Sequence, residues 1–288
     1  MDAAPSTASL RIPFDTGCST IDAVTVATWA SISRRSLATI DDVHLSYSDP
    51  CGILELRTQI AEYLRAVRGA NCEPDQIIVT SGTQQGLDLA LRVALDRQDE
   101  IWMEDPCYEL AYRAAISAGL RVQSVPVDAE GLLVSEGIRS APRARAVIVT
   151  PSHQYPLGMV LSMRRRLELL DWARDRSAWI IEDDYDSEFR YAGRPLAALQ
   201  GLDENDRVIY LGTFSKSLFP GLRLGYAVVP RFLVKAFTGA RYLTDRHPPT
   251  LSQVILTKFM SDAHYSAHIR RARLAYRSAR GILISELK

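Results

Sequence analysis

One lysine stands in a run of small, apolar and turn-forming residues, the stretch GTFSKSLFPGLRLGY at 212–226. The chain has only four lysines, at positions 216, 235, 258 and 288, against thirty arginines. Arginine keeps its proton in proteins, whereas a lysine amine can lose it and then act as a nucleophile or form an imine. A solvated loop lysine is the ordinary alternative. The choice of lysine at position 216 therefore makes Lys216 a candidate for covalent chemistry.

A second candidate is the acidic stretch EDDYDSE at 182–188, which follows an apolar strand pattern at 179–181. Its carboxylates could bind Mg²⁺ or Ca²⁺, or could form a solvated acidic loop. A third interpretation suits the position better. A single buried carboxylate at the end of a strand can hold a protonated ring nitrogen, as a pyridinium cofactor requires.

Two further polar stretches also follow predicted strands. In TSGTQQG, at 80–86, Gly82 opens a helix whose first N–H groups could bind a phosphate, although such a turn is also an ordinary helix cap. In PSHQYPLG, at 151–158, His153 is a general base or a structural hydrogen-bonding group. Arg223 adds a cation seven residues after Lys216, and Tyr108 follows an Asp-Pro pair. Together these stretches provide a phosphate-binding turn, a strand-end carboxylate, an aromatic ring and an imine-forming lysine. This combination predicts a site for pyridoxal 5′-phosphate (PLP).

The elements that position these residues form an alternating pattern. From about residue 74, short β-branched runs alternate with longer amphipathic stretches, which predicts helices on both faces of a mostly parallel sheet. Seven strands are predicted, at 77–80, 101–104, 122–125, 146–150, 179–182, 208–211 and 224–229. Helices are predicted at 52–64, 84–95, 108–118, 164–174, 231–243 and 251–288, with a break at 247–249. Ligands of an open α/β sheet bind beyond the carboxyl ends of its strands, where these polar stretches lie.

Composition narrows the class of protein. Lys plus Arg and Asp plus Glu both number 34, so no basic field is available for nucleic acid or an anionic membrane. The four cysteines are far apart, with no CxxC pair, which argues against a zinc site and against a disulfide framework. No apolar run approaches the roughly 20 residues of a membrane helix. We therefore expect a cytoplasmic protein that does not bind nucleic acid directly.

The motifs SGTQQGLDLALR, EDPCY, PSHQYPLG, EDDYDSEFRY and GTFSKSLFPGLRLGY, in this order, closely resemble the aminotransferase-like domain of MocR/GabR-type regulators of the GntR superfamily. That domain is a branch of the PLP-dependent class I/II aminotransferases of fold type I. The resemblance runs from about Phe14 to the end of the chain. It implies a homodimer that binds an amino acid or an amine.

The resemblance also implies roles for single residues. Lys216 would bind PLP as a Schiff base and move a proton at the substrate, Asp183 would pair with the ring nitrogen, and Tyr185 would donate to the phenolic oxygen. The remaining cofactor contacts that it implies are Tyr108 on the ring face, His153 beside the ring, and Gly82, Thr83, Gln84, Thr213, Ser215 and Arg223 around the phosphate. Tyr47 would reach the phosphate of the neighbouring subunit. The pair His153-Gln154 stands where ordinary aminotransferases have Asn-Pro.

Two departures from the family pattern lead to the expected domain organisation. Regulators of this branch have an N-terminal winged helix-turn-helix, and their C-terminal small domain continues further and supplies an arginine for the substrate carboxylate. We expect an arm or linker remnant at 1–46, a large PLP-binding domain at 47–235, and the helical start of a truncated small domain at 236–288. Two functions stay open: transamination of an amino acid, and a catalytically silent domain that senses an effector.

Overall fold

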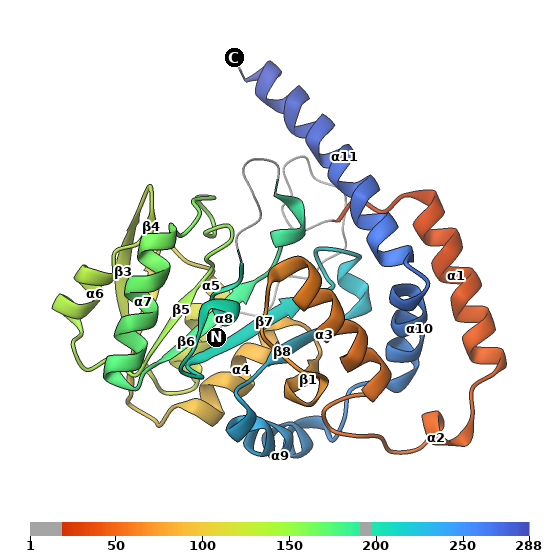
Figure 1. The fold of residues 1–288 in the computed structure, drawn as a ribbon, viewed down its shortest axis with the longest axis horizontal. Coiled ribbons are helices and arrows are strands. Elements are labelled where there is room, and N and C mark those ends of the chain that lie inside the picture. The colour runs from red at the N-terminus through yellow and green to blue at the C-terminus, as the bar shows by residue number, and fades with distance from the viewer. Residues whose placement is uncertain (1–18, 191–196, 288) are drawn as a thin grey trace.

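The computed structural model describes residues 19–190 and 197–287 (Figure 1). Its centre is a sheet in the order β1-β8-β7-β6-β5-β2-β3-β4. The strands are β1 (Ile77–Thr80), β2 (Glu100–Asp105), β3 (Arg121–Asp128), β4 (Gly131–Leu132), β5 (Ala146–Val149), β6 (Trp179–Asp184), β7 (Val208–Thr213) and β8 (Gly225–Val228). Strands β3, β2, β5, β6 and β7 pair in parallel, and β8 runs antiparallel between β7 and β1.

The seven predicted strands are confirmed in position. The sheet has an eighth strand that was not predicted. The eighth, β4, contributes two residues that pair antiparallel with Val127 and Asp128 of β3. A two-residue strand is too short to show an alternating pattern, so no sequence signal marked it. Gly131 begins it with a φ of 94°, a conformation that favours glycine.

Helices cover both faces of the sheet, as predicted (Figure 1). On one face α4 (Thr83–Ala94), α5 (Glu109–Ser117) and α9 (Val234–Asp245) pack on the strands. On the other face lie α6 (Val134–Ser140), α7 (Met163–Arg176) and α8 (Leu199–Leu202). Successive strand residues face opposite sides, so Ile180 packs in one core and Ile181 in the other. Strands buried on both faces explain the apolar runs AVIV of β5, WII at the start of β6 and VIYL at the start of β7.

A third core packs against β1, β7 and β8 and joins helices from the two ends of the described chain. It contains residues of α1 (Ala23–Ala38), α3 (Leu54–Arg68), α10 (Thr250–Ser261) and α11 (His264–Glu286), together with β1, β7 and β8. The short helix α2 (Asp42–Leu45) lies between α1 and α3 in the chain and contacts α10. Within the stretch 1–46, expected to be an arm or linker remnant, the described part therefore includes two helices.

The predicted helix at 251–288 is wrong as a single element. It divides into α10 and α11 because Ala263 adopts a left-handed conformation, with φ of 59°. No Gly or Pro lies at this break, so the usual stop signal of a helix is missing there.

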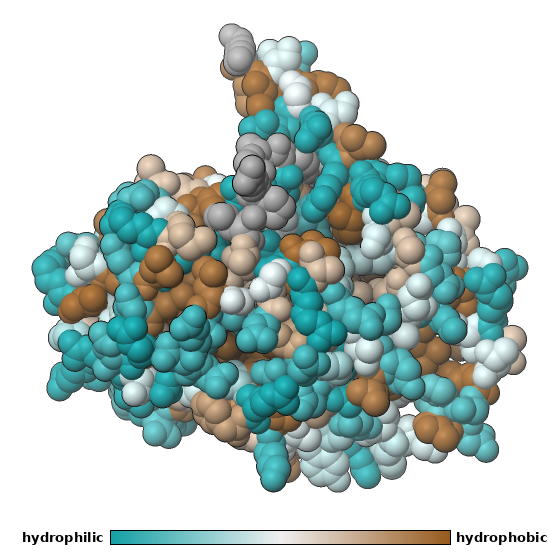
Figure 2. Space-filling view, viewed as in Figure 1, coloured by the Kyte–Doolittle hydropathy of each residue, from teal (hydrophilic) through white to brown (hydrophobic). Residues whose placement is uncertain are grey.

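The far half of α11 projects from the body and exposes apolar side chains (Figures 1 and 2). The large apolar residues exposed there are Leu274, Ile282, Leu283 and Ile284 of α11 and Leu287, which follows the helix.

In the part of the chain that the structure describes, no helix combines the length and apolar character needed to cross a membrane.

Candidate active site

The strand register brings the separate motifs to one edge of the sheet. Strands β6 and β7 are parallel neighbours, and Asp183 pairs with Leu211 near their carboxyl ends. Gly225 of β8 pairs with Thr213 of β7 on one side and with Thr80 of β1 on the other. The loops that follow β1 and β6 and the loop that joins β7 to β8 therefore meet side by side. Those loops carry the phosphate motif, the acidic stretch and the lysine.

The first turn of α4 is the corner of this site where the sequence predicts a bound phosphate. Gly82 caps the helix with φ of 95° and ψ of 171°, and the first N–H groups of an α-helix have no acceptor within the helix. The Arg223 guanidinium lies against Gly82, at 3.5 Å from the place where a Cβ would stand, and donates to the Ser81 carbonyl at 2.8 Å. A Cβ on Gly225 would lie 2.8 Å from the Gly82 Cα. Glycine at both positions thus lets the two loops touch and leaves N–H groups and a guanidinium at one corner.

Thr83 and Gln84 begin α4 at the same corner. The Gln84 amide donates to the Leu110 carbonyl at 3.2 Å, so this side chain is already used between α4 and α5. The Gln85 side-chain oxygen accepts from the Ser81 N–H at 2.8 Å and so fixes the turn. Sequence reasoning missed Gln85, although it stands in the quoted motif.

The lysine loop is a compact turn that leaves β7 and returns to β8. The Thr213 hydroxyl accepts from the Ser215 N–H at 3.1 Å, and the Phe214 N–H donates to the Leu224 carbonyl at 3.0 Å. Thr213 is buried, whereas Ser215 and Lys216 are half-buried. The turn therefore holds Lys216 at the edge of the sheet without enclosing it.

The acidic stretch is divided among different partners. Glu182 accepts from the N–H groups of Leu199 and Gln200, both at 3.0 Å. Asp184 accepts from the Arg68 guanidinium at 2.8 Å and from the Tyr210 hydroxyl at 2.6 Å. Within the described residues, no group of three or more His, Cys, Asp or Glu side chains could hold a metal ion. The separate partners explain why these carboxylates do not converge on a cation.

Asp183 lacks the donors that its neighbour Asp184 has. The Oδ1 atoms of both residues are buried without a hydrogen-bond partner among the described residues, but the Oδ2 of Asp184 accepts from Arg68 and Tyr210. Burial, and then the nearby carboxylates of Asp184, Asp186 and Glu104, raise the pKa of Asp183 to about 7. A buried acceptor without a donor is costly unless a ligand supplies one. A pyridinium N–H is such a donor, so this residue fits the ring of PLP.

Three tyrosines form a row beside Asp183. The rings of Tyr108 and Tyr155 meet edge to face with centroids 5.6 Å apart, and Tyr155 meets Tyr185 in the same way at 6.1 Å. Burial raises the pKa of Tyr185, and the charges of Asp186 and Asp183 add to the effect. Burial and then the charge of Asp183 also raise the pKa of Tyr108. Sequence reasoning missed Tyr155, which only the fold brings between the other two rings.

His153 is held by a carboxylate. Its Nδ1 lies 2.8 Å from the Asp186 Oδ1, and this hydrogen bond raises the pKa of His153. The neighbouring Gln154 amide donates to the carbonyls of Pro106 and Tyr155, both at 2.7 Å. The two side chains thus stabilise the turn after β5, which is the structural alternative considered for His153.

Tyr47 lies apart from this group within the same chain. It is 74% exposed, and the Arg246 guanidinium lies 3.5 Å from its ring centroid. An exposed position is compatible with the role across a subunit boundary that the family resemblance implies.

Two buried polar residues that support the site were also missed. Glu104 accepts from the N–H and the hydroxyl of Thr150 at 3.1 and 2.6 Å, and burial raises its pKa to about 7. Arg68 joins α3 to Asp184 and donates to the Ser152 hydroxyl at 2.7 Å. A lone Arg within a helix pattern carries no signal of such a role.

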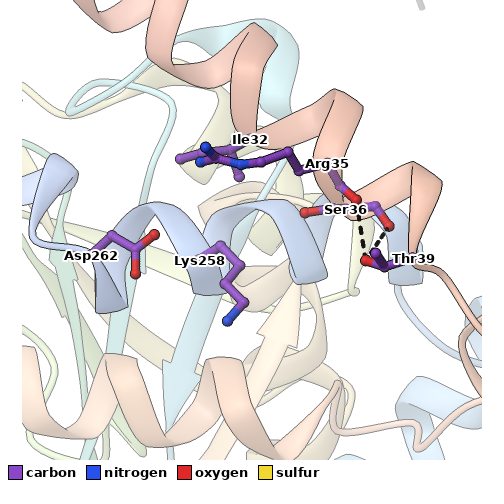
Figure 3. A pocket seen from close by; sticks show the side chains of 6 residues that line it. All are labelled: Ile32, Arg35, Ser36, Thr39, Lys258 and Asp262. Carbon is purple, nitrogen blue, oxygen red and sulfur yellow. Dashed lines mark hydrogen bonds between the residues drawn. The ribbon is translucent and has the colours of Figure 1, made fainter.

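A hollow of about 380 Å³ lies elsewhere, between α1 and α10 (Figure 3). Its lining residues are Ile32, Arg35, Ser36, Thr39, Lys258 and Asp262. The Thr39 hydroxyl donates to the carbonyls of Arg35 and Ser36 at 3.1 and 3.4 Å. None of the predicted site residues lines this hollow.

Similarity to solved structures extends over most of the chain. A kynurenine aminotransferase of Pyrococcus horikoshii, solved in complex with PMP, has a TM-score of 0.85 and 30% identity over 91% of this chain and 66% of that one. The α-aminoadipate aminotransferase LysN of Thermus thermophilus, complexed with N-(5′-phosphopyridoxyl)-L-leucine, has a TM-score of 0.80 and 30% identity over 88% of this chain and 64% of that one. The predicted aminotransferase fold is thereby confirmed.

Sequence comparison gives the same family and adds the regulators. The probable rhizopine catabolism regulatory protein MocR of Rhizobium meliloti is 41% identical over 96% of this chain and 55% of its own length. An aromatic-amino-acid aminotransferase of Thermococcus litoralis is 32% identical over 85% of this chain and 60% of its own length. The chain thus spans about half the length of the regulators it matches. A family model for aminotransferase class I and II matches residues 13–288, so this chain belongs to the class I and II aminotransferase family, in a branch shared with MocR-type regulators.

Proposed function

We propose that this chain binds PLP through Lys216 and supports transamination of an amino acid. The observation that carries the proposal is the buried Asp183 Oδ1, which has no partner among the described residues. It lies on the strand next to the one that leads into the lysine loop. Relatives solved with PMP or a phosphopyridoxyl group support the choice of cofactor.

Each residue of the site has a proposed task. Asp183 would keep the ring nitrogen protonated, and Tyr185 would donate a hydrogen bond to the phenolic oxygen. The first turn of α4 and Arg223 would bind the phosphate, because N–H groups and a guanidinium converge there. Bound PLP supplies an electron sink that stabilises negative charge at the substrate Cα. The Lys216 amine would move the proton at that carbon.

A second function is favoured by the relatives. The chain is 41% identical to a regulatory protein, so it could sense an amino acid or amine without turning it over. Both functions use the same cofactor residues. We also propose a homodimer, in which Tyr47 reaches the partner subunit, and a cytoplasmic location, in which thiols such as those of Cys51 and Cys72 stay reduced.

The cofactor claim is tested by covalent trapping. The protein is mixed with PLP, reduced with borohydride and digested, and the modified peptide is identified by mass spectrometry. We expect one modified residue, Lys216, and no modification in Lys216→Ala. Lys235→Ala, on the exposed side of α9, is the matched control and should be labelled like the parent. Absence of label at Lys216 would falsify the proposal.

The choice between enzyme and sensor needs a second step. The loaded protein is given a panel of amino acids and amines, followed by a 2-oxo acid. Release of the oxo product from the first ligand, and recovery of the original absorbance with the second, identify transamination. A change of absorbance with no oxo product identifies a sensor.

A further inference from the structure

Three consecutive carbonyls of the lysine loop are held by side chains from the two ends of the described chain. The Ser19 hydroxyl lies 2.9 Å from the Ser215 carbonyl and 3.1 Å from that of Lys216. The His268 Nε2 lies 2.9 Å from the Ser217 carbonyl. These contacts span 196, 197 and 51 residues of sequence. The backbone on both sides of Lys216 is therefore fixed from outside the loop.

The partners of His268 determine its tautomer. A carbonyl oxygen only accepts hydrogen bonds, so Nε2 must carry the hydrogen that bonds to the Ser217 carbonyl. In the neutral ring Nδ1 is then an acceptor, and the Thr25 hydroxyl at 2.8 Å is its donor. Both side chains are 1% exposed. Burial is the main cause that lowers the pKa of His268, which favours this neutral form.

A second layer links this histidine to the start of α1. The Thr25 hydroxyl accepts from an Arg271 N–H at 3.0 Å, which leaves its own hydrogen free to point at His268. Asp22 caps α1 by accepting from the Thr25 N–H at 2.6 Å and pairs with the Arg271 Nε at the same distance. Hydrogen bonds thus run from Asp22 through Thr25 and His268 to the Ser217 carbonyl. Every polar group in this series has a defined donor or acceptor role.

We propose that His268 and Ser19 are positioning residues for Lys216 and that they couple helix α1 to the cofactor site. This inference rests on the proposed function of Lys216. A loop held by three carbonyl contacts has fewer conformations to lose when its lysine is engaged. Because coupling between two sites is reciprocal, cofactor binding and the docking of α1 strengthen each other by the same factor.

The test compares two substitutions of His268. We expect one of them to weaken PLP binding and the other to leave it nearly unchanged. In His268→Gln the side-chain amide N–H reaches the position of Nε2 and keeps the bond to the Ser217 carbonyl. In His268→Asn the shorter amide reaches only the position of Nδ1, so the contact with Thr25 is kept and the contact with the loop is lost. One net hydrogen bond changes an equilibrium constant roughly two- to tenfold. We expect the Kd of PLP to rise by that factor in His268→Asn and to stay within about twofold of the parent in His268→Gln.

Hydrogen exchange of the full chain supplies a readout that does not depend on activity. In the parent, PLP should slow exchange across α1 as well as in the lysine loop. In His268→Asn exchange of both segments should be faster without PLP, and PLP should protect α1 less. Ser19→Ala removes two of the three carbonyl contacts without changing the buried histidine, and should act in the same direction. His264→Asn, one turn earlier on α11, is the matched control and should match the parent.

Equal behaviour of His268→Asn and His268→Gln would overturn the positioning role. A parent chain in which PLP leaves α1 exchange unchanged would overturn the coupling. If the parent forms no covalent product at Lys216, the proposed function fails by itself. The exchange of the two His268 variants without PLP then still decides whether these contacts order the loop.

Discussion

The substitution Asp183→Asn separates the charge of the strand-end carboxylate from its shape. Asparagine has nearly the same size and keeps an acceptor oxygen at Oδ1, so the packing around β6 is preserved. What it removes is the negative charge that would pair with a protonated ring nitrogen. The Kd of PLP should therefore rise.

The magnitude follows from the type of hydrogen bond that is changed. A hydrogen bond to a charged group contributes about 1.5–3 kcal/mol and a neutral one about 0.5–1.5 kcal/mol. The difference of roughly 1–2 kcal/mol corresponds to a five- to thirtyfold weaker Kd. This ratio applies at pH 8, where the Asp183 carboxyl, with its pKa raised to about 7, is mostly ionised in the cofactor-free protein.

The raised pKa of Asp183 also makes the ratio of the two Kd values, variant to parent, depend on pH. A positive ring nitrogen favours the ionised carboxylate, so below pH 7 binding must first release the Asp183 proton. As the pH falls below 7, the affinity of the parent for PLP therefore decreases by up to about tenfold per pH unit. The affinity of Asp183→Asn does not decrease for this reason, because asparagine has no carboxyl proton to release. The two Kd values should therefore converge between pH 8 and pH 6.

The assay is an absorbance titration of each protein with PLP at pH 6, 7 and 8. Asp171→Asn, which removes an exposed carboxylate on α7, is the matched control. Without PLP, Asp183→Asn should also raise the melting temperature at pH 8. A carboxyl whose pKa is raised from 3.8 to about 7 stabilises the fold fully at low pH and loses that contribution as the pH rises through 7. Equal Kd values of parent and variant at pH 8, or a ratio that is the same at pH 6 and pH 8, would refute the reasoning.

Three further substitutions test the phosphate corner and the supporting core. Arg223→Gln should weaken PLP binding roughly tenfold or more, because a charge-assisted hydrogen bond to phosphate is lost, and should leave the affinity for pyridoxal, which has no phosphate, unchanged in the same titration. Arg68→Met should lower the free energy of unfolding by about 3 kcal/mol in urea, because it leaves the buried Asp184 carboxylate without its cation. Gly137→Ala should lower it by up to about 2 kcal/mol. Its Cβ would lie 2.7 Å from the Trp102 ring, and overpacking of about 1–3 kcal/mol outweighs a helix-propensity gain of about 1 kcal/mol.

Each of these predictions has an outcome that contradicts it. Equal losses for PLP and pyridoxal in Arg223→Gln would mean that the guanidinium acts on the loop and not on the phosphate. Parent-like stability of Arg68→Met would mean that the hydroxyl donors of Tyr210 and Ser187 are enough to stabilise the buried Asp184. A more stable Gly137→Ala would mean that the Trp102 ring can shift, although its Nε1 is bonded to the Ala141 carbonyl at 3.0 Å and its ring stacks on Trp172.

The strands were predictable because their pattern is local. Apolar runs such as AVIV at 146–149 and the short Gly- and Ser-containing turns after them mark buried strands of an α/β sheet wherever the rest of the chain goes. The two wrong predictions of elements also have local causes. The strand β4 was missed because it is only two residues long, and the break at Ala263 was missed because no Gly or Pro lies there.

The site was only partly predictable for a different reason. Motif order placed Lys216, Asp183 and Arg223 at strand ends, and the register of β1, β8, β7 and β6 brings those ends together. The individual hydrogen bonds depend on residues far away in sequence. Asp184 obtains its cation from Arg68, 116 residues earlier, and no pattern around either residue indicates the pairing.

The sequence by itself therefore determined which chemistry is available: a lysine in an arginine-rich chain, an acidic strand end and a helix that begins with glycine. Only the tertiary structure decided which carboxylate of the acidic stretch stays without a partner, because burial and long-range donors act on each one differently. It also placed Ser19 and His268 against the loop of Lys216, from elements 196 and 51 residues away from their carbonyl partners. The sequence specifies which side chains are present, whereas their desolvation and their hydrogen-bond partners arise only when distant segments pack together.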